Sequence, residues 1–167
     1  MVRYFVGPSH PIADQLAEAA LALSRECKGA LVALERAMPL DAYVETGVRL
    51  DAEVSAMLIR TIFTPLSPLH DGAVILSGGR IRGAGCQLPL TQPSEGANPH
   101  LGMRHRAALS LSEETDAVLL VVSEETGRIS LAAGGRLEAI PREMLSRRLV
   151  DLLSSPDGAE RSLPRAA

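Results

Sequence analysis

A carboxylate and an imidazole stand side by side at the mouth of an apolar run in the segment LHDGAVIL, residues 69–76. A carboxylate such as Asp71 can hold a divalent cation or accept a proton from a hydroxyl group. The simpler interpretation is a turn that leads into a buried strand, because glycine tolerates positive φ and β-branched residues suit a pleated core. This segment alone leaves both interpretations open.

A second segment with chemical potential is LGMRHRAAL, residues 101–109, in which Gly102 precedes Arg104, His105 and Arg106 at a predicted helix start. Free backbone N–H groups and the helix dipole favour an anion at such a position. Two guanidinium groups there would clamp a phosphate. The alternative is a pair of solvated surface arginines, since residues i and i+2 of a regular helix point apart.

A third segment, VSEETG at residues 122–127, places Glu124 and Glu125 at the tip of a predicted hairpin. An ordinary polar turn is the simplest interpretation of these residues. A chemical role would require the fold to bring this tip close to one of the other two segments.

The elements that must position these segments alternate between helical and strand patterns. Apolar residues at helical spacing predict a helix over residues 12–27, and a second helix over residues 52–63 with Asp51 as its cap. Short apolar runs predict strands at residues 29–35, 73–76, 81–88, 117–122 and 128–132, and glycine-containing turns join the second to the third and the fourth to the fifth as hairpins. Further helices are expected over residues 101–111 and from Pro141 to about residue 153, with a loop at residues 91–99.

These elements predict a single globular domain of the α/β (α+β) class, with a central mixed β-sheet flanked by helices. The length of 167 residues suits one core rather than two. We expect the domain to occupy residues 1–153, and residues 154–167, which contain few apolar side chains, to form a flexible tail.

Composition excludes several classes of function. A net charge of −3 and an aromatic content of 2% offer neither a basic field nor stacking platforms, so nucleic acid is not expected as a partner. The two cysteines lie far apart without a CxxC pair, which argues against a disulfide framework or a zinc ribbon. The single lysine, Lys28, lies in no Walker-type or kinase-type motif. Phosphate binding must therefore depend on arginine, backbone amides or a metal.

Taken together, the three segments resemble the diadenylate cyclase domain, the catalytic module that makes cyclic di-AMP. The resemblance covers residues 29–137 and is carried by LHDGAVI, by the RHR run about thirty residues later, and by TDAVLLVVSEETG. It also includes ALERAMPLDAYVETGVRLDAEVSAMLIRTIF before the first motif and AGCQLPL between the first two.

The resemblance implies that two ATP molecules condense to cyclic di-AMP, a bacterial second messenger, with release of two pyrophosphates. Each 3′-hydroxyl must attack the α-phosphorus of the other nucleotide, so the implied catalyst is a homodimer with facing sites, and higher assemblies are left open. A divalent cation, Mg²⁺ or Mn²⁺, is the implied cofactor.

The resemblance also implies roles for individual residues. Asp71 is assigned to the reacting centre, as a metal ligand that helps to deprotonate the 3′-hydroxyl, with His70 and Glu125 as further metal ligands. The catalytic set is completed by Arg104, His105 and Arg106, which match the triphosphate-binding run. The implied ATP-binding residues are Gly72, Ala73, Gln87, Leu88, Gly102, Met103, Arg104, His105, Arg106, Ser123 and Glu124.

Two positions depart from the family pattern. Met103 stands where most members carry a hydroxyl residue, so one side-chain phosphate contact is missing while the backbone N–H remains. Gln87 stands where an aromatic side chain is common on the adenine side, which weakens stacking and selectivity for adenine.

Two alternative functions follow from the same residues. A catalytically silent nucleotide-binding module of the same fold is compatible with Met103. An HD-type phosphohydrolase would also use a His-Asp pair, but it needs further metal-binding histidines and aspartates on a helical scaffold, whereas His70 and Asp71 lead into an apolar strand.

The sequence contains no apolar stretch of the ~18 residues that a membrane span requires, so we expect a cytoplasmic domain. One family architecture joins the cyclase to N-terminal membrane helices, and residues 2–6 followed by an amphipathic helix resemble such a junction. We therefore expect the chain to be part of a longer protein, anchored to a membrane only through a preceding segment.

Overall fold

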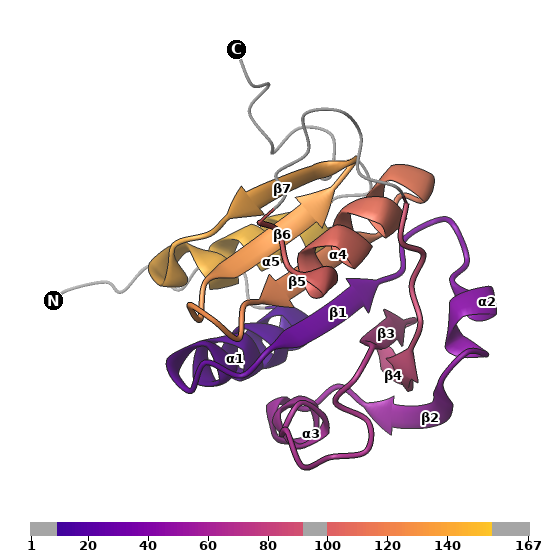
Figure 1. The fold of residues 1–167 in the computed structure, drawn as a ribbon, viewed down its shortest axis with the longest axis horizontal. Helices are drawn as coiled ribbons and strands as arrows, with labels where there is room; N and C mark the ends of the chain where they lie inside the picture. Colours follow the sequence, from indigo (N-terminus) through magenta and orange to yellow (C-terminus); the bar gives the residue numbers. More distant parts are fainter. Residues whose placement is uncertain (1–9, 92–99, 155–167) are drawn as a thin grey trace, which may run out of the picture.

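The computed structural model describes residues 10–91 and 100–154. They form one sheet with helices on both faces (Figure 1). The helices are α1 Pro11–Arg25, α2 Asp41–Val44, α3 Ala56–Ile62, α4 Met103–Glu114 and α5 Leu145–Ser154, with a 3₁₀ turn at Arg142–Met144. The strands are β1 Ala30–Leu34, β2 Val48–Glu53, β3 Ala73–Ser77, β4 Arg80–Cys86, β5 Val118–Val122, β6 Ile129–Ala133 and β7 Arg136–Ala139.

The sheet has seven strands in the order β2-β4-β3-β1-β5-β6-β7. Only β1 and β3 pair in parallel, and the other neighbours are antiparallel. All residues of β1, β5 and β6 are buried, as expected for strands covered on both faces. The prediction of a mixed sheet flanked by helices is therefore confirmed.

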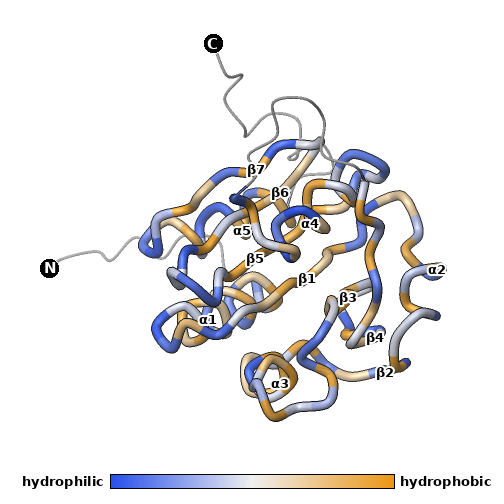
Figure 2. The backbone as a smooth tube through the Cα atoms, viewed as in Figure 1, coloured by the Kyte–Doolittle hydropathy of each residue, from blue (hydrophilic) through white to orange (hydrophobic). Residues whose placement is uncertain are grey.

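Alternate residues of the central strands enter two separate hydrophobic layers. In β1, Val32 and Leu34 pack with α1, α3 and α5, whereas Leu31 and Ala33 pack with α2 and α4 on the other face. This arrangement follows from the two-residue period of a strand. Figure 2 shows the hydrophobic stretches that run along β1 and β5 between the helices.

The predicted helix over residues 52–63 is wrong in its first part. Residues 48–53 form β2, in which Leu50 and Ala52 alternate with exposed neighbours and pack against the core. The helix begins at Ala56, and the hydroxyl of Ser55 caps it by accepting a hydrogen bond from the Leu58 N–H at 3.3 Å. Asp51 is not a cap, since its carboxylate pairs with Arg80 at 2.6 Å.

Most other predicted elements are confirmed within a few residues, including α1, β1, α4 and both hairpins, while α2 and β7 were not predicted. The expected loop at residues 91–99 lies outside the described residues except for Thr91, and the expected tail lies outside them except for Ser154. The N-terminal junction at residues 2–6 is also outside them. The limits of the domain remain a prediction.

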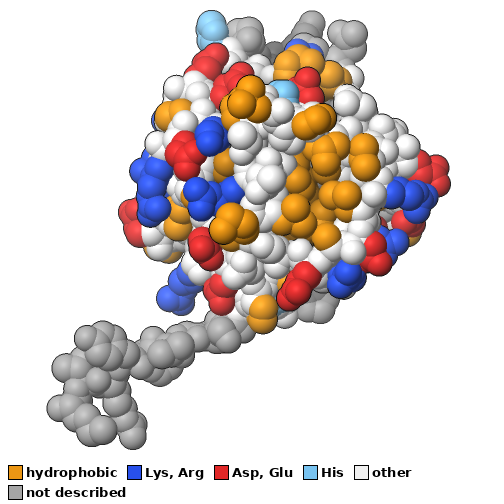
Figure 3. All heavy atoms as spheres, turned by 90° about the horizontal axis from the view of Figure 1, so that it is seen from below, with side chains coloured by type: hydrophobic (Ala, Val, Ile, Leu, Met, Phe, Trp, Pro, Cys, Tyr) orange, Lys and Arg blue, Asp and Glu red, His pale blue; other side chains and the backbone are white. Residues whose placement is uncertain are grey.

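Two surface properties bear on contacts with other molecules. Within the described residues, no helix has the length and apolar character needed to cross a membrane. The side of the fold seen in Figure 3 carries a patch of hydrophobic side chains between charged ones. Met57 of α3 and Leu66 just after it are both highly exposed large apolar side chains. Apolar surface of this kind is typical of contact regions when it is contiguous.

Candidate functional site

One edge of the sheet gathers the three segments that the sequence singles out. The parallel register of Val32 with Val74 places the starts of β1 and β3 side by side. The antiparallel pairs of β1 with β5 and of β3 with β4 bring the ends of β5 and β4 to the same edge. Residues 71–72, 87–88 and 123–125 therefore meet near the beginning of α4.

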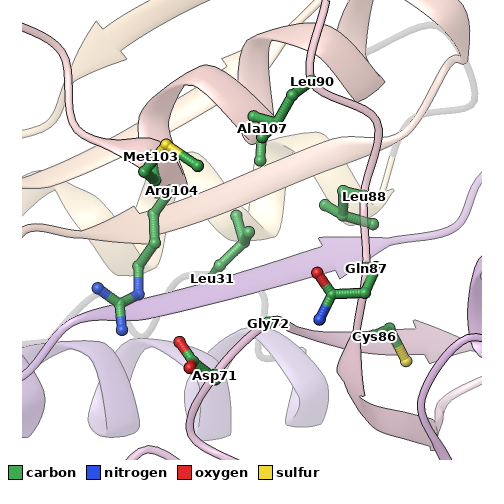
Figure 4. A pocket seen from close by; sticks show the side chains of 10 residues that line it. All are labelled: Leu31, Asp71, Gly72, Cys86, Gln87, Leu88, Leu90, Met103, Arg104 and Ala107. Atoms are coloured by element: carbon green, nitrogen blue, oxygen red, sulfur yellow. The ribbon is translucent and has the colours of Figure 1, made fainter.

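A pocket of about 180 Å³ opens at this edge between β1, β4 and α4 (Figure 4). Its apolar walls are made by Leu31, Leu88, Leu90 and Ala107. Polar groups enter from Asp71, Gln87 and Arg104, and the side chains of Asp71 and Arg104 point toward one another across the opening. The pocket thus combines an apolar slot with one anionic and one cationic group.

A second cavity of about 330 Å³ adjoins the first, and the two share Met103 and Arg104. It is lined by His100, Leu101, Gly102, His105 and Arg128, and by the turn after β5 with Val122, Ser123, Glu124, Glu125 and Thr126. The structure therefore brings the RHR run, residues 104–106, close to the turn at residues 123–126, although the two are separated in sequence. Backbone N–H groups at the start of α4, together with Arg104 and Arg128, make this cavity suitable for phosphate groups.

Arg104 is the charged residue that lines both cavities. Its side chain is only 23% exposed, and its Nη1 lies 3.5 Å from Oε2 of Glu124. The predicted phosphate-binding run thus holds one arginine at the boundary between the apolar slot and the polar cavity.

Gly72 places Asp71 by bringing the start of β3 close to the end of β4. It has φ of +99°, and a Cβ atom there would lie 2.7 Å from the carbonyl oxygen of Cys86. Only glycine meets both conditions without strain. The carboxylate of the preceding residue, Asp71, is consequently exposed at the rim of the pocket.

The segment after β4 is held by a residue that the sequence did not single out. The hydroxyl of Thr46 accepts a hydrogen bond from the Gln87 N–H at 2.8 Å and donates one to the Tyr43 carbonyl at 2.6 Å. The backbone N–H and carbonyl of Leu88 have no hydrogen-bond partner among the described residues. They are therefore available to a ligand in the pocket.

Two titratable groups at the site are held in their neutral forms. Burial, with a smaller contribution from the charge of Arg104, lowers the pKa of His105, so its imidazole is neutral at pH 7. Burial raises the pKa of the Cys86 thiol to about 11. The thiol of Cys86 is therefore protonated, and the residue is part of the pocket wall and not a thiolate nucleophile.

Three predicted site residues lie outside both cavities. Nδ1 of His70 donates to the Ser67 carbonyl at 2.7 Å, and Ala73 is fully buried in β3. Nη1 of Arg106 lies 4.0 Å from the sulfur of Met103, on a regular helix where Arg104 and Arg106 diverge. Of the two arginines of the RHR run, the structure therefore brings only Arg104 into the cavities, and the roles of His70, Ala73 and Arg106 remain predictions.

The predicted metal ligands are not gathered in one place. Asp71 lines the first cavity, Glu125 lines the second, and His70 lines neither. Among the described residues, no three His, Cys, Asp or Glu side chains form a group that could hold a metal ion. A cation at this site would need ligands in addition to those of one chain.

Residues that the sequence did not single out complete the site: Leu31, Thr46, Leu90, Ala107 and Arg128. Ala107 follows Arg104 by three residues on the same helix, so helical spacing could have placed it on the same face. No comparable signal marks the others, because their position depends on how distant strands pair. An apolar slot beside a polar cavity that contains arginines and helix N-terminal N–H groups is an arrangement that suits a nucleotide.

Comparison with known proteins places the chain in a family. The family model described as DisA bacterial checkpoint controller nucleotide-binding, or DAC, matches residues 17–137. The chain belongs to this family, which confirms the resemblance identified in the sequence.

Individual relatives give the same result. The chain is 47% identical over 127 residues to the cyclic di-AMP synthase CdaS of Bacillus subtilis, a match that covers 76% of this chain and 60% of that protein. It is 44% identical over 128 residues to a diadenylate cyclase of Listeria monocytogenes, covering 77% of this chain and 46% of that protein. The chain thus spans about half the length of curated relatives that it matches.

The fold is also similar to solved structures. The crystal structure of DacA from Staphylococcus aureus superposes with a TM-score of 0.80 at 38% identity, covering 84% of this chain and 93% of that one. A protein of Bacillus cereus described as a hypothetical membrane spanning protein superposes with a TM-score of 0.75 at 45% identity, covering 81% of this chain and 66% of that one.

Proposed function

We propose that the chain condenses two ATP molecules into cyclic di-AMP, with release of two pyrophosphates, when two copies bring their sites face to face. The observation that carries this proposal is the meeting of Asp71 and Arg104 across one pocket with apolar walls. The relatives named as cyclic di-AMP synthase and diadenylate cyclase support the choice of reaction.

The two cavities divide the nucleotide between them. The base fits the apolar slot, where Leu31 and Ala107 contact its faces and the free backbone groups of Leu88 bind its edge. The triphosphate fits the adjoining cavity, where Arg104 neutralises charge on the phosphates and on the departing pyrophosphate. His105 is neutral, so it donates one N–H or accepts one hydrogen bond without adding charge.

Asp71 is the group at the reacting end. Its exposed carboxylate lies opposite Arg104, where it can accept a proton from a 3′-hydroxyl. Mg²⁺ in proteins is commonly held by one or two carboxylates together with substrate phosphates and water, so a single carboxylate suits this cation, and Mn²⁺ also prefers oxygen ligands. Asp71 would hold the metal, which when bound neutralises phosphate charge and lowers the pKa of the attacking hydroxyl. Glu125 and His70 are further proposed ligands.

A second copy of the chain is required by the chemistry. Each 3′-hydroxyl attacks the α-phosphorus of the other ATP, so neither site can complete the reaction alone. The pocket of about 180 Å³ is smaller than the ~300 Å³ or more typical of ligand sites, and it is open at its rim. A facing subunit would enclose the remainder of the nucleotide.

Incubation with ATP and either Mg²⁺ or Mn²⁺, followed by chromatography of the products, tests the proposal. Cyclic di-AMP and pyrophosphate in a ratio of one to two are expected, with a rate per chain that rises with protein concentration as dimers form. Hydrolysis products would instead indicate a phosphohydrolase. Unchanged ATP that nevertheless binds would indicate a silent nucleotide-binding module, the alternative that the exposed Met103 side chain favours.

Membrane attachment is a separate part of the proposal. The related Bacillus cereus protein is described as membrane spanning, and the chain matches 66% of that structure. We propose that this domain works on the cytoplasmic side of a membrane, attached through a segment that precedes it. Fractionation of cells that express the full gene tests this, and recovery of all the protein in the supernatant would contradict it.

A further inference from the structure

The guanidinium of Arg104 lies directly over Gly29, the residue that precedes β1. A Cβ atom at Gly29 would be 2.5 Å from Nη1 of Arg104, 2.7 Å from its Cζ and 3.1 Å from its Nε. The three heavy atoms nearest to this Cβ position therefore all belong to one side chain. Any larger residue at this position would occupy the place of the guanidinium.

The backbone of Gly29 does not itself require glycine. Gly72 and Gly127 have positive φ, whereas Gly29 has a conformation that other residues adopt readily. Gly29 is also buried, and the strand that follows it is buried at every residue. The physical reason for a glycine here is therefore the space that Arg104 fills.

The place that Gly29 leaves open determines where the charge of Arg104 lies. On one side Nη1 approaches Glu124 at 3.5 Å, and on the other the side chain faces Asp71 across the pocket. The floor beneath the guanidinium is the backbone at Gly29. The side chain is only 23% exposed, between the backbone at Gly29 and the carboxylate of Glu124, which restricts a long and otherwise flexible group.

We propose that Gly29 is a positioning residue, which seats the Arg104 guanidinium at the boundary of the two cavities where it meets the triphosphate. This role rests on the proposed binding of ATP at this site. A methyl group at Gly29 would push the guanidinium away from the β1 edge, so the arginine would keep its charge and lose its fixed position. The expected consequence is weaker binding of the phosphates with unchanged binding of the base.

A double-mutant cycle tests the proposal with four proteins: the wild type, Gly29→Ala, Arg104→Ala and the double variant. Calorimetry with ATP and with adenosine separates phosphate binding from base binding. We expect Gly29→Ala to weaken ATP binding roughly 10-fold or more, the scale of one hydrogen bond to a charged group, and to leave adenosine binding unchanged. In the Arg104→Ala background no guanidinium meets the added methyl group, so Gly29→Ala should cause no further change in ATP affinity.

Each other outcome also decides the question. An unchanged ATP affinity in Gly29→Ala, an equal loss in the Arg104→Ala background, or a parallel loss of adenosine binding would overturn the positioning role. If Gly29→Ala fails to fold while the double variant folds, the steric conflict with Arg104 is established directly. If neither folds, glycine is needed by the backbone and the proposal fails.

The test also separates this inference from the proposed function. A wild type that binds ATP but makes no cyclic di-AMP would refute the cyclase activity and leave the binding cycle fully informative. A wild type that binds neither ATP nor inorganic tripolyphosphate would overturn both proposals.

Discussion

The guanidinium of Arg104 and the carboxylate of Glu124 lie 3.5 Å apart and connect the start of α4 with the turn after β5. The glutamate is 67% exposed, so the pair is an exposed ion pair worth about 1 kcal/mol or less. In the absence of a metal, this carboxylate competes with phosphate oxygens for Arg104. Glu124→Gln should therefore tighten the binding of metal-free ATP by up to ~5-fold.

Calorimetry in EDTA measures this effect, and Glu125→Gln provides a control of equal charge in the same turn. Glu125 lines the same cavity, whereas the ion pair to Arg104 comes from Glu124. A larger gain in Glu125→Gln than in Glu124→Gln would show that general repulsion, and not competition for Arg104, limits binding.

Asp71→Asn should separate binding from turnover. Asparagine keeps the shape of the side chain and serves a turn equally well, but it removes the charge that holds a metal and accepts a proton. We expect a near-normal melting temperature, retained ATP binding, and little or no cyclic di-AMP at any concentration of Mg²⁺ or Mn²⁺. Turnover at the wild-type rate would show that residues 70–73 (HDGA) form only a turn.

Arg104 and Arg106 should behave differently despite their similar sequence context. Arg104→Ala removes a preorganised cation from both cavities and should lower cyclic di-AMP synthesis by roughly 10²–10³-fold, with weaker ATP binding. Arg106 lies outside both cavities of its own chain, beside Met103. Arg106→Ala should keep ATP affinity within ~2-fold and lose synthesis only if the arginine meets the nucleotide of a facing subunit.

Titrations with ATP and product assays on both variants distinguish these cases. If Arg106→Ala weakens ATP binding, the result would support the clamp of two arginines that the sequence predicts. Normal synthesis by the same variant would assign Arg106 to the surface.

Sequence patterns predicted the part of the site that lies within continuous segments. Helical spacing indicated that α4 begins near Arg104, and the apolar run after Gly72 indicated β3. The patterns did not predict how these segments meet. The parallel register of β1 with β3 brings Gly29 to the Asp71 edge, and no residue in either segment specifies that pairing.

The incorrect start of the helix predicted over residues 52–63 has a similar cause. Leu50 and Ala52 fit a strand, while the residues that follow fit a helix, and Asp51 could cap a helix by type alone. Pairing of β2 with β4 decided the outcome, since it brings Asp51 beside Arg80. Thr46 was missed for the same reason, because its partner Gln87 lies 41 residues away.

The capping of helix α3 by Ser55 gives a prediction for the stability of the fold. Ser55→Ala removes the acceptor for the Leu58 N–H and should lower the free energy of unfolding by about 1 kcal/mol. Asp51→Ala disrupts only an exposed ion pair and should change it by less. Urea unfolding of both variants measures the difference. A larger loss for Asp51→Ala would indicate that Asp51, and not Ser55, caps the helix.

The neutral state of His105 gives a prediction for pH. Its pKa lies below the ordinary value of about 6.5, first because the residue is half-buried and second because Arg104 is nearby. As the pH falls through about 6.5, the unfolded chain takes up a proton at this residue while the folded chain does not. This contribution to stability is therefore complete above pH ~6.5 and is lost as the pH falls toward the lowered pKa of the folded state.

Titration of the imidazole C–H signals by NMR measures the effect, with His105→Asn to assign the resonance among the four histidines of the chain. Arg104→Ala should raise the pKa of His105 but leave it below its ordinary value, because burial is the larger of the two causes. The unfolding free energy of His105→Asn should lack the wild type's loss near pH 6, since asparagine does not titrate. If the pKa of His105 in the wild type instead lies above neutral pH, the ring carries a proton when ATP binds. Its role would then be that of a second cation beside Arg104 and not a neutral hydrogen-bonding group.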